Sequence, residues 1–96
     1  MNPVLIKIHP DDTVAIVAND HGLSVGTEVP GGLILLDAVP QGHKVLLVDT
    51  EEGADIIRYG EVIGKAVTKL LRGSWLQEDF IRLPEPPALN ELPLAT

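Results

Sequence analysis

The feature that most constrains the fold of this sequence is its density of glycine and proline. The 96 residues include nine glycines and eight prolines, about one such residue in six. In a helix interior glycine costs about 1 kcal/mol and proline about 3 kcal/mol, so this density is incompatible with long helices. Between these residues lie short runs rich in β-branched side chains, which favour strands. The sequence therefore predicts an all-β domain with six or more short strands and at most one or two short helices.

Six runs have the composition of strands: Val4–Ile8, Val14–Ala18, Leu33–Leu36, Lys44–Val48, Ile56–Tyr59 and Glu61–Val67. The second run is apolar throughout, which predicts a central strand, whereas the first alternates around Lys7 and predicts a half-buried one. A further, partly apolar stretch covers Trp75–Leu83. Turn-forming residues separate the runs, as expected for a sandwich or a barrel-like domain.

Two local features add detail to this prediction. Thr50–Ala54 can form one helical turn, because Thr50 can cap it and two glutamates follow. Gly64 stands inside a predicted strand, which indicates a bulge or a close approach of another backbone. A helix over Val62–Leu71 is the second-ranked alternative for this region, because the segment combines β-branched residues with that glycine.

Length and composition exclude several classes of protein. A chain of 96 residues has room for one core, and we expect the domain to cover residues 1–83, followed by a proline-rich linker at 84–96. The net charge of −7 argues against binding to nucleic acid or to an anionic membrane. Cysteine is absent, which excludes disulfides and thiolate metal sites. With no signal peptide and no long apolar run, the expected location is the cytoplasm.

Histidines and carboxylates in turns are the first candidates for chemistry. His9 and His43 lie at the ends of predicted strands, where a neutral imidazole can accept a proton or bind a divalent ion. No local pattern of metal-ligating histidines occurs, so a structural role in a turn is the competing interpretation. Asp11 and Asp12 could act as acid and base or hold a cation, but capping of the turn is the favoured interpretation for them.

The segment Arg58-Tyr59-Gly60-Glu61 combines a guanidinium, a phenol, a flexible backbone and a carboxylate. Arg58 could bind a carboxylate in bidentate fashion. The alternative is a surface pair of Arg58 with Glu61 and a Tyr59 ring packed on the core.

Several motifs, in order along the chain, resemble one family of enzymes. Residues 8–17 (IHPDDTVAIV), 40–45 (PQGHKV), 56–64 (IIRYGEVIG) and 72–75 (RGSW) are similar to segments of the galactarate and altronate dehydratases. The third and fourth segments are more similar to the galactarate branch. The chain's last residues, 83–85 and 92–96, resemble that branch's linker into its catalytic domain.

The resemblance implies a fold and a context for this chain. It implies the N-terminal SAF domain of these enzymes, a β-clip fold related to type III antifreeze proteins. The full enzymes dehydrate sugar acids and depend on a divalent metal, iron or a similar ion. No metal is expected on this chain alone, because most of the catalytic apparatus belongs to a much larger catalytic domain. A separate small subunit of this type is known in a related two-chain lyase.

These implications lead to two competing hypotheses of function. In the first, the domain completes or gates the active site for a hexarate sugar acid. His43 and His9 are then the catalytic candidates, with Lys44, Arg58 and Tyr59 as substrate-binding residues and His9 as a possible metal ligand. In the second, the domain is a non-catalytic binding or oligomerisation module. We also expect a homo-oligomer, with residues 75–83 as its contact surface, because a separated small β-domain exposes apolar surface or a strand edge.

Overall fold

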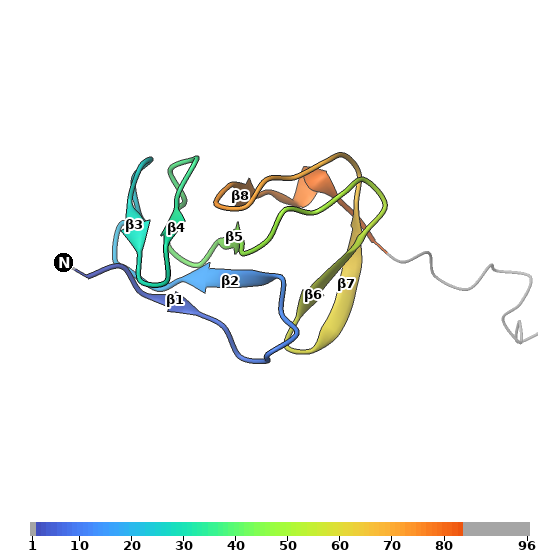
Figure 1. Ribbon diagram of the computed structural model, residues 1–96, viewed down its shortest axis with the longest axis horizontal. Helices are drawn as coiled ribbons and strands as arrows, with labels where there is room; N and C mark the ends of the chain where they lie inside the picture. The colour runs from blue at the N-terminus through green and yellow to red at the C-terminus, as the bar shows by residue number, and fades with distance from the viewer. Residues whose placement is uncertain (1, 84–96) are drawn as a thin grey trace, which may run out of the picture.

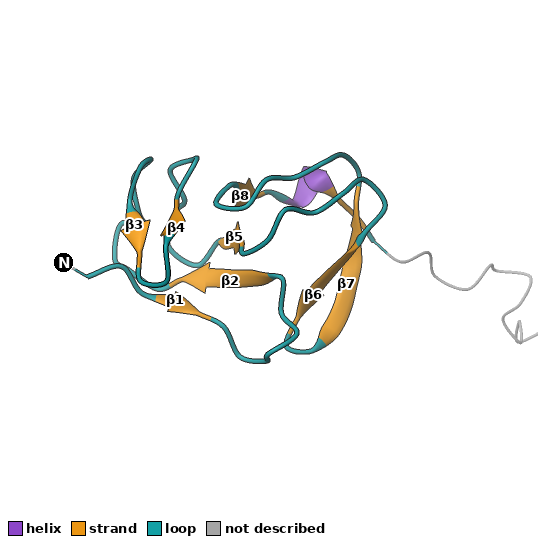
Figure 2. Cartoon of the chain, viewed as in Figure 1, coloured by secondary structure: helices purple, strands orange, loops and turns teal. Residues whose placement is uncertain are grey.

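The structure is a computed structural model that describes residues 2–83, and within them the fold is almost entirely β (Figures 1 and 2). The only helix in this range is a single 3₁₀ turn, so no described helix could cross a membrane. The elements, in chain order, are β1 (Leu5–Ile6), β2 (Val14–Val17), β3 (Glu28–Val29), β4 (Leu33–Ile34), β5 (Lys44–Leu46), β6 (Asp55–Arg58), β7 (Glu61–Ala66), β8 (Trp75–Leu76), η1 (Glu78–Phe80) and β9 (Ile81–Arg82).

All strand pairs are antiparallel and form three small sheets. The largest has the order β1-β2-β5-β8, β3 pairs only with β4, and the third has the order β6-β7-β9. In Figure 1 the β3–β4 hairpin and the β6–β7 hairpin lie at opposite ends of the largest sheet. The predicted all-β fold is therefore confirmed.

The two central strands of the largest sheet, β2 and β5, are buried on both faces, because they lie between two apolar clusters. Successive strand residues point to opposite faces, so Val45 packs into one cluster and Leu46 into the other. Val14 and Val17 of β2 are divided in the same way, and both are almost fully buried. The prediction of a central strand here is confirmed, and the double burial explains why the run is apolar throughout.

Two details differ from the sequence-based expectations, and a third settles an alternative in favour of the first-ranked strand. Thr50–Ala54 forms no helical turn: Thr50 pairs with Leu70 in an isolated bridge, and a tight turn follows at Gly53, whose φ is +82°. The backbone N–H and C=O groups of Thr50 both form hydrogen bonds with Leu70, so the carbonyl is not available to a helical turn. The strand β3 was not predicted, because two residues between glycine-rich turns leave no periodicity to recognise. The alternative helix over Val62–Leu71 is excluded by β7.

A glycine inside a strand indicates a bulge or a close approach of another backbone, and Gly64 has both. The register between β6 and β7 shifts at Ile56/Ile57, so that Ile56 pairs with Gly64 and Ile57 with Val62. A Cβ on Gly64 would also lie 2.8 Å from the carbonyl oxygen of Arg82 and would collide with the Ile81 side chain. The bulge and the close approach of β9 are therefore both present.

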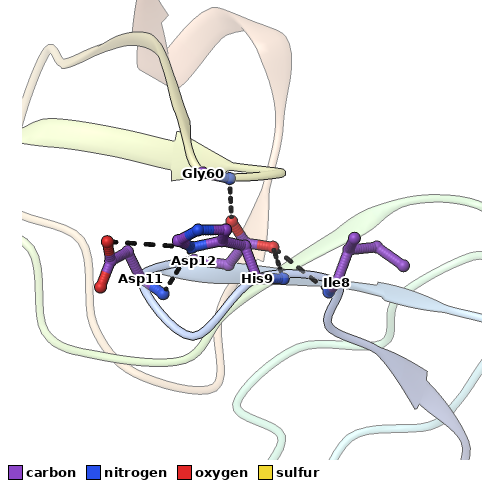
Figure 3. Close-up of polar contacts among 5 residues, drawn as sticks. All are labelled: Ile8, His9, Asp11, Asp12 and Gly60. Atoms are coloured by element: carbon purple, nitrogen blue, oxygen red, sulfur yellow. Dashed lines mark hydrogen bonds and ion pairs between the residues drawn. The ribbon is translucent and has the colours of Figure 1, made fainter.

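Asp12 connects the first loop to the turn between β6 and β7. Its Oδ1 accepts a hydrogen bond from the Gly60 N–H at 2.8 Å, and its Oδ2 accepts bonds from the N–H groups of His9 at 3.0 Å and Ile8 at 3.3 Å. Figure 3 shows the carboxylate between these two backbone segments. The residue is buried, with only 5% of its surface exposed to solvent. The predicted role of Asp12 in capping a turn is confirmed, and it extends to a second turn 48 residues away.

The same contacts set the acidity of this carboxyl group. Burial works to raise the pKa of Asp12, whereas hydrogen bonds from the backbone N–H groups of Gly60, His9, Tyr59 and Ile8 lower it. The net result is a pKa below the ordinary value of 3.8. The charged form of Asp12 is therefore the one that the fold stabilises.

Replacing Gly64 by alanine should destabilise the domain by about 1–3 kcal/mol, because the new methyl group overpacks the contact with β9. Urea unfolding of the 96-residue chain measures this change. In an Ile81→Ala background the same substitution should cost less, since the side chain with which it collides is gone. A Gly64→Ala variant as stable as the parent would contradict the close approach.

Replacing Asp12 by asparagine should lower Tm by several degrees at neutral pH and should flatten the acid limb of the stability profile. Because the folded pKa is depressed, the stabilisation is complete above the unfolded pKa of about 4 and is lost as pH falls through the folded pKa. Melting curves from about pH 7 to about pH 3 follow this loss. Asp11→Asn is the matched control, because it removes the same charge and none of these hydrogen bonds. Identical acid limbs for Asp12→Asn and the parent would refute the assignment.

Candidate functional site

The candidate residues fall into two groups. His43, Lys44 and Arg58 line two adjoining hollows, whereas His9 and Tyr59 lie at the turn between β6 and β7 and line neither. The first group, with Trp75, Glu78 and Asp79, is called the Lys44 surface below.

The two hollows of the Lys44 surface have three residues in common. One has a volume of about 410 Å³ and includes His43, and the other has a volume of about 460 Å³ and includes Arg58. Lys44, Glu78 and Asp79 line both of them. The antiparallel pairing of Lys44 with Leu76 places η1 beside β5, and this brings the two carboxylates to the cations.

His43 is held by an aromatic contact. Its ring meets the indole of Trp75 edge to face, with 5.4 Å between centroids. Such a contact stabilises one orientation of the imidazole next to the hollow. The indole Nε1 of Trp75 is buried and has no hydrogen-bond partner within residues 2–83.

Arg58 and Tyr59 form a stacked pair at the end of β6. The Arg58 guanidinium carbon lies 4.4 Å from the centre of the Tyr59 ring, and its Nη2 donates a hydrogen bond to the phenol oxygen at 2.9 Å. Tyr59 is 50% exposed, so the alternative in which its ring packs on the core is wrong. Arg58 pairs with Glu61 in the β ladder, but in the described chain no ion pair joins the two side chains.

The turn that carries Tyr59 is conformationally strained. Tyr59 and Gly60 both have positive φ, +57° and +75°, as in the type I′ turns that join two-residue hairpins. A bulky residue is uncommon in this region of backbone space. Gly60 is also required by space, because a Cβ there would lie 2.9 Å from the His9 ring.

His9 lies against this turn and is engaged locally. Its Nδ1 accepts a hydrogen bond from the Asp11 N–H at 3.1 Å (Figure 3). A neutral ring bonded in this way carries its proton on Nε2. The Asp11 carboxylate is 3.8 Å from the same nitrogen, and we regard the shorter backbone bond as the one that orients the ring.

The described residues do not assemble a metal site. Between residues 2 and 83, no three side chains of histidine, aspartate or glutamate are placed to hold one ion. Metal sites in proteins normally need three or more convergent protein ligands. These residues alone therefore do not fit a divalent ion.

Sequence reasoning missed three residues of the Lys44 surface: Trp75, Glu78 and Asp79. They belong to a segment 30 or more residues from His43, and only the β5–β8 pairing brings them there. Trp75 belongs to the RGSW motif, which indicated the family and not the site, and no local motif marks Glu78 or Asp79. The predicted linker at 84–96 lies outside the described residues.

Comparison with known proteins places these features in a family. The family model described as altronate/galactarate dehydratase SAF domain matches residues 3–84. The chain is 56% identical over 91 residues to galactarate dehydratase (L-threo-forming) of Escherichia coli strain K12, which covers 95% of this chain and 17% of that enzyme. It is 41% identical over 71 residues to altronate dehydratase of the same strain, which covers 71% of this chain and 14% of that enzyme.

The chain thus spans about one sixth of the length of the curated relatives that it matches. The family match extends over both apolar clusters, the Asp12 contacts and the whole Lys44 surface. The resemblance inferred from short motifs is confirmed over nearly the full chain, and the chain belongs to the SAF domain family of the altronate and galactarate dehydratases.

Proposed function

We propose that this chain is the accessory domain of a sugar-acid hydro-lyase and that its Lys44 surface faces the substrate in the catalytic domain. The observation that carries the proposal is the meeting of His43, Lys44 and Arg58 around two adjoining hollows. In a chain of net charge −7, this gathering of cations is local. Because Glu78 and Asp79 line the same hollows, the Lys44 surface is locally balanced in charge within an acidic domain, and it offers a dianion two cationic donors.

The chemistry of the surface suits a hexarate in a second way. A sugar acid carries carboxylates, which accept hydrogen bonds, and hydroxyl groups, which can donate them. Lys44 and Arg58 supply donors for the carboxylates, whereas Glu78 and Asp79 supply acceptors for the hydroxyls. Charged partners of both kinds make stronger hydrogen bonds than neutral ones, and they also fix the orientation of the ligand.

Dehydration requires removal of a proton next to a carboxylate and departure of a hydroxyl group. In the proposed arrangement, Lys44 and Arg58 hold the carboxylate, and His43 is close enough to the same surface to exchange a proton. A divalent metal, iron or a similar ion, would assist departure of the hydroxyl group from within the catalytic domain. His9, engaged with Asp11 and the Gly60 turn, is proposed to act mainly on the position of the hairpin that carries Arg58.

The competing function is an assembly module. A homo-oligomer, with residues 75–83 as a contact surface, remains a prediction for the enzyme as well as for this chain. In that case the Lys44 surface would contact protein instead of substrate. The two functions differ in what the same substitutions do to the reaction rate.

In the full enzyme that carries this domain, His43→Ala or Arg58→Ala should lower kcat/KM for galactarate about tenfold or more, which corresponds to about 1.4 kcal/mol. Lys69→Ala is the matched control, because it removes a cation that pairs with Glu51 at 3.4 Å, outside the Lys44 surface. Melting curves must show that each variant is folded. Unchanged rates for both folded variants would contradict the substrate-facing role and would favour the assembly function.

The isolated 96-residue chain should not dehydrate galactarate, with or without added ferrous iron or manganese. The described residues do not bring together enough ligands for a metal ion. Lys44 and Arg58 are also too few to hold both carboxylates of the substrate without the catalytic domain. A coupled assay for the keto product measures the rate, with the full enzyme as positive control. Turnover by the chain alone would overturn the proposed division of labour.

A further inference from the structure

A third hollow lies away from the Lys44 surface and has a different character. It has a volume of about 450 Å³ and lies between β1, the β3–β4 hairpin and the segment after β5. In Figure 1 the β3–β4 hairpin lies at one end of the largest sheet, and β6 and β7 lie at the other. This size is within the range of small-molecule sites in proteins.

The floor of this hollow is the apolar core itself. Val29 and Leu33 belong to one of the two buried clusters, and Leu5 and Leu47 pack against that cluster. The other uncharged lining residues are alanine, valine, proline and glycine. Because the floor is part of the packed interior, the hollow is formed before any ligand arrives.

The charged residues of the hollow are Lys7 and Arg72, and no carboxylate lines it. This differs from the chain as a whole, in which Asp and Glu outnumber Lys and Arg by 14 to 7. In residues 2–83, neither Lys7 nor Arg72 takes part in an ion pair, whereas Lys65 and Lys69 both do. The Asp49 carboxylate accepts a hydrogen bond from the Arg72 backbone N–H at 2.8 Å, and within residues 2–83 the two cationic side chains beside the apolar floor have no ion-pair partner.

From this complementarity we propose that the hollow binds a small carboxylate with an aliphatic body. The carboxylate meets Lys7 and Arg72, and the hydrocarbon chain covers Leu5, Val29, Leu33 and Leu47. Burying the hydrocarbon supplies the main driving force, and the two cations select an anion over a neutral ligand.

The proposed ligand differs from the sugar acid of the Lys44 surface. A hexarate carries hydroxyl groups along its chain, and the aliphatic side chains of the floor offer them no hydrogen-bond partners. Glu78 and Asp79, which can accept from hydroxyls, line the other hollows only. The site is therefore independent of the proposed function, and its failure would leave that proposal untouched.

An NMR titration of the ¹⁵N-labelled 96-residue chain tests the site. Hexanoate should shift the backbone amides of Leu5, Val29 and Leu33 in a saturable way, with an affinity in the millimolar range. Hexan-1-ol, which has the same body without the charge, should bind about tenfold more weakly or worse. Galactarate, charged but hydroxylated, should leave these amides unshifted.

A pair of double variants separates the local cations from the net charge. Lys7→Gln with Arg72→Gln should weaken hexanoate binding about tenfold or more. Lys65→Gln with Lys69→Gln removes the same two charges outside the hollow and should leave the binding unchanged. The unperturbed amides in each spectrum report that the fold is intact.

Three results would each overturn the proposal. Equal affinities for hexanoate and hexan-1-ol would remove the role of the cations. If both double variants weakened hexanoate binding equally, the effect would come from the overall charge of the chain and not from Lys7 and Arg72. Absence of saturable hexanoate shifts would show that the hollow does not bind an aliphatic carboxylate.

Discussion

The arrangement of this domain depends on one buried carboxylate. Asp12 accepts hydrogen bonds from the backbone of its own loop and from Gly60 in the β6–β7 turn. The next residue continues the connection, because Thr13 and Ile57 exchange two bonds of 3.0 Å, and the Thr13 carbonyl accepts from Leu47 at 2.8 Å. Two consecutive side chains thus join the third sheet to the largest one. The orientation of Arg58 follows from this connection, since Arg58 ends the strand that it holds.

The small size of the domain limits how much apolar surface it can bury. A chain this short buries a limited fraction of its surface, and it has no disulfide to compensate. Placing the largest sheet between two apolar clusters lets β2 and β5 contribute side chains on both faces. Polar chemistry is thereby confined to strand ends and turns, where the Lys44 surface and the hairpin of Tyr59 are found.

The distribution of charge is as informative as its sum. Asp and Glu outnumber Lys and Arg by 14 to 7, yet cations gather in two places. At the Lys44 surface they are accompanied by carboxylates, which suits a ligand with both hydroxyl and carboxylate groups. Beside the core cluster of Val29 and Leu33, they accompany only apolar residues, which suits a ligand with a hydrocarbon body.

By itself the sequence determined the class of fold, because strand periodicity and turn chemistry are local properties. It indicated the central strand at Val14, the turn at Asp12 and the special role of Gly64, and its motifs indicated the family. It was wrong about a helical turn at Thr50, where a distant partner, Leu70, took the backbone bond. Only the tertiary structure decided that Trp75 and Glu78 join His43 and Lys44, and that Lys7 and Arg72 line one hollow with an apolar floor. These meetings arise from antiparallel pairing and core packing between segments far apart in the chain, and no local pattern of residues records them.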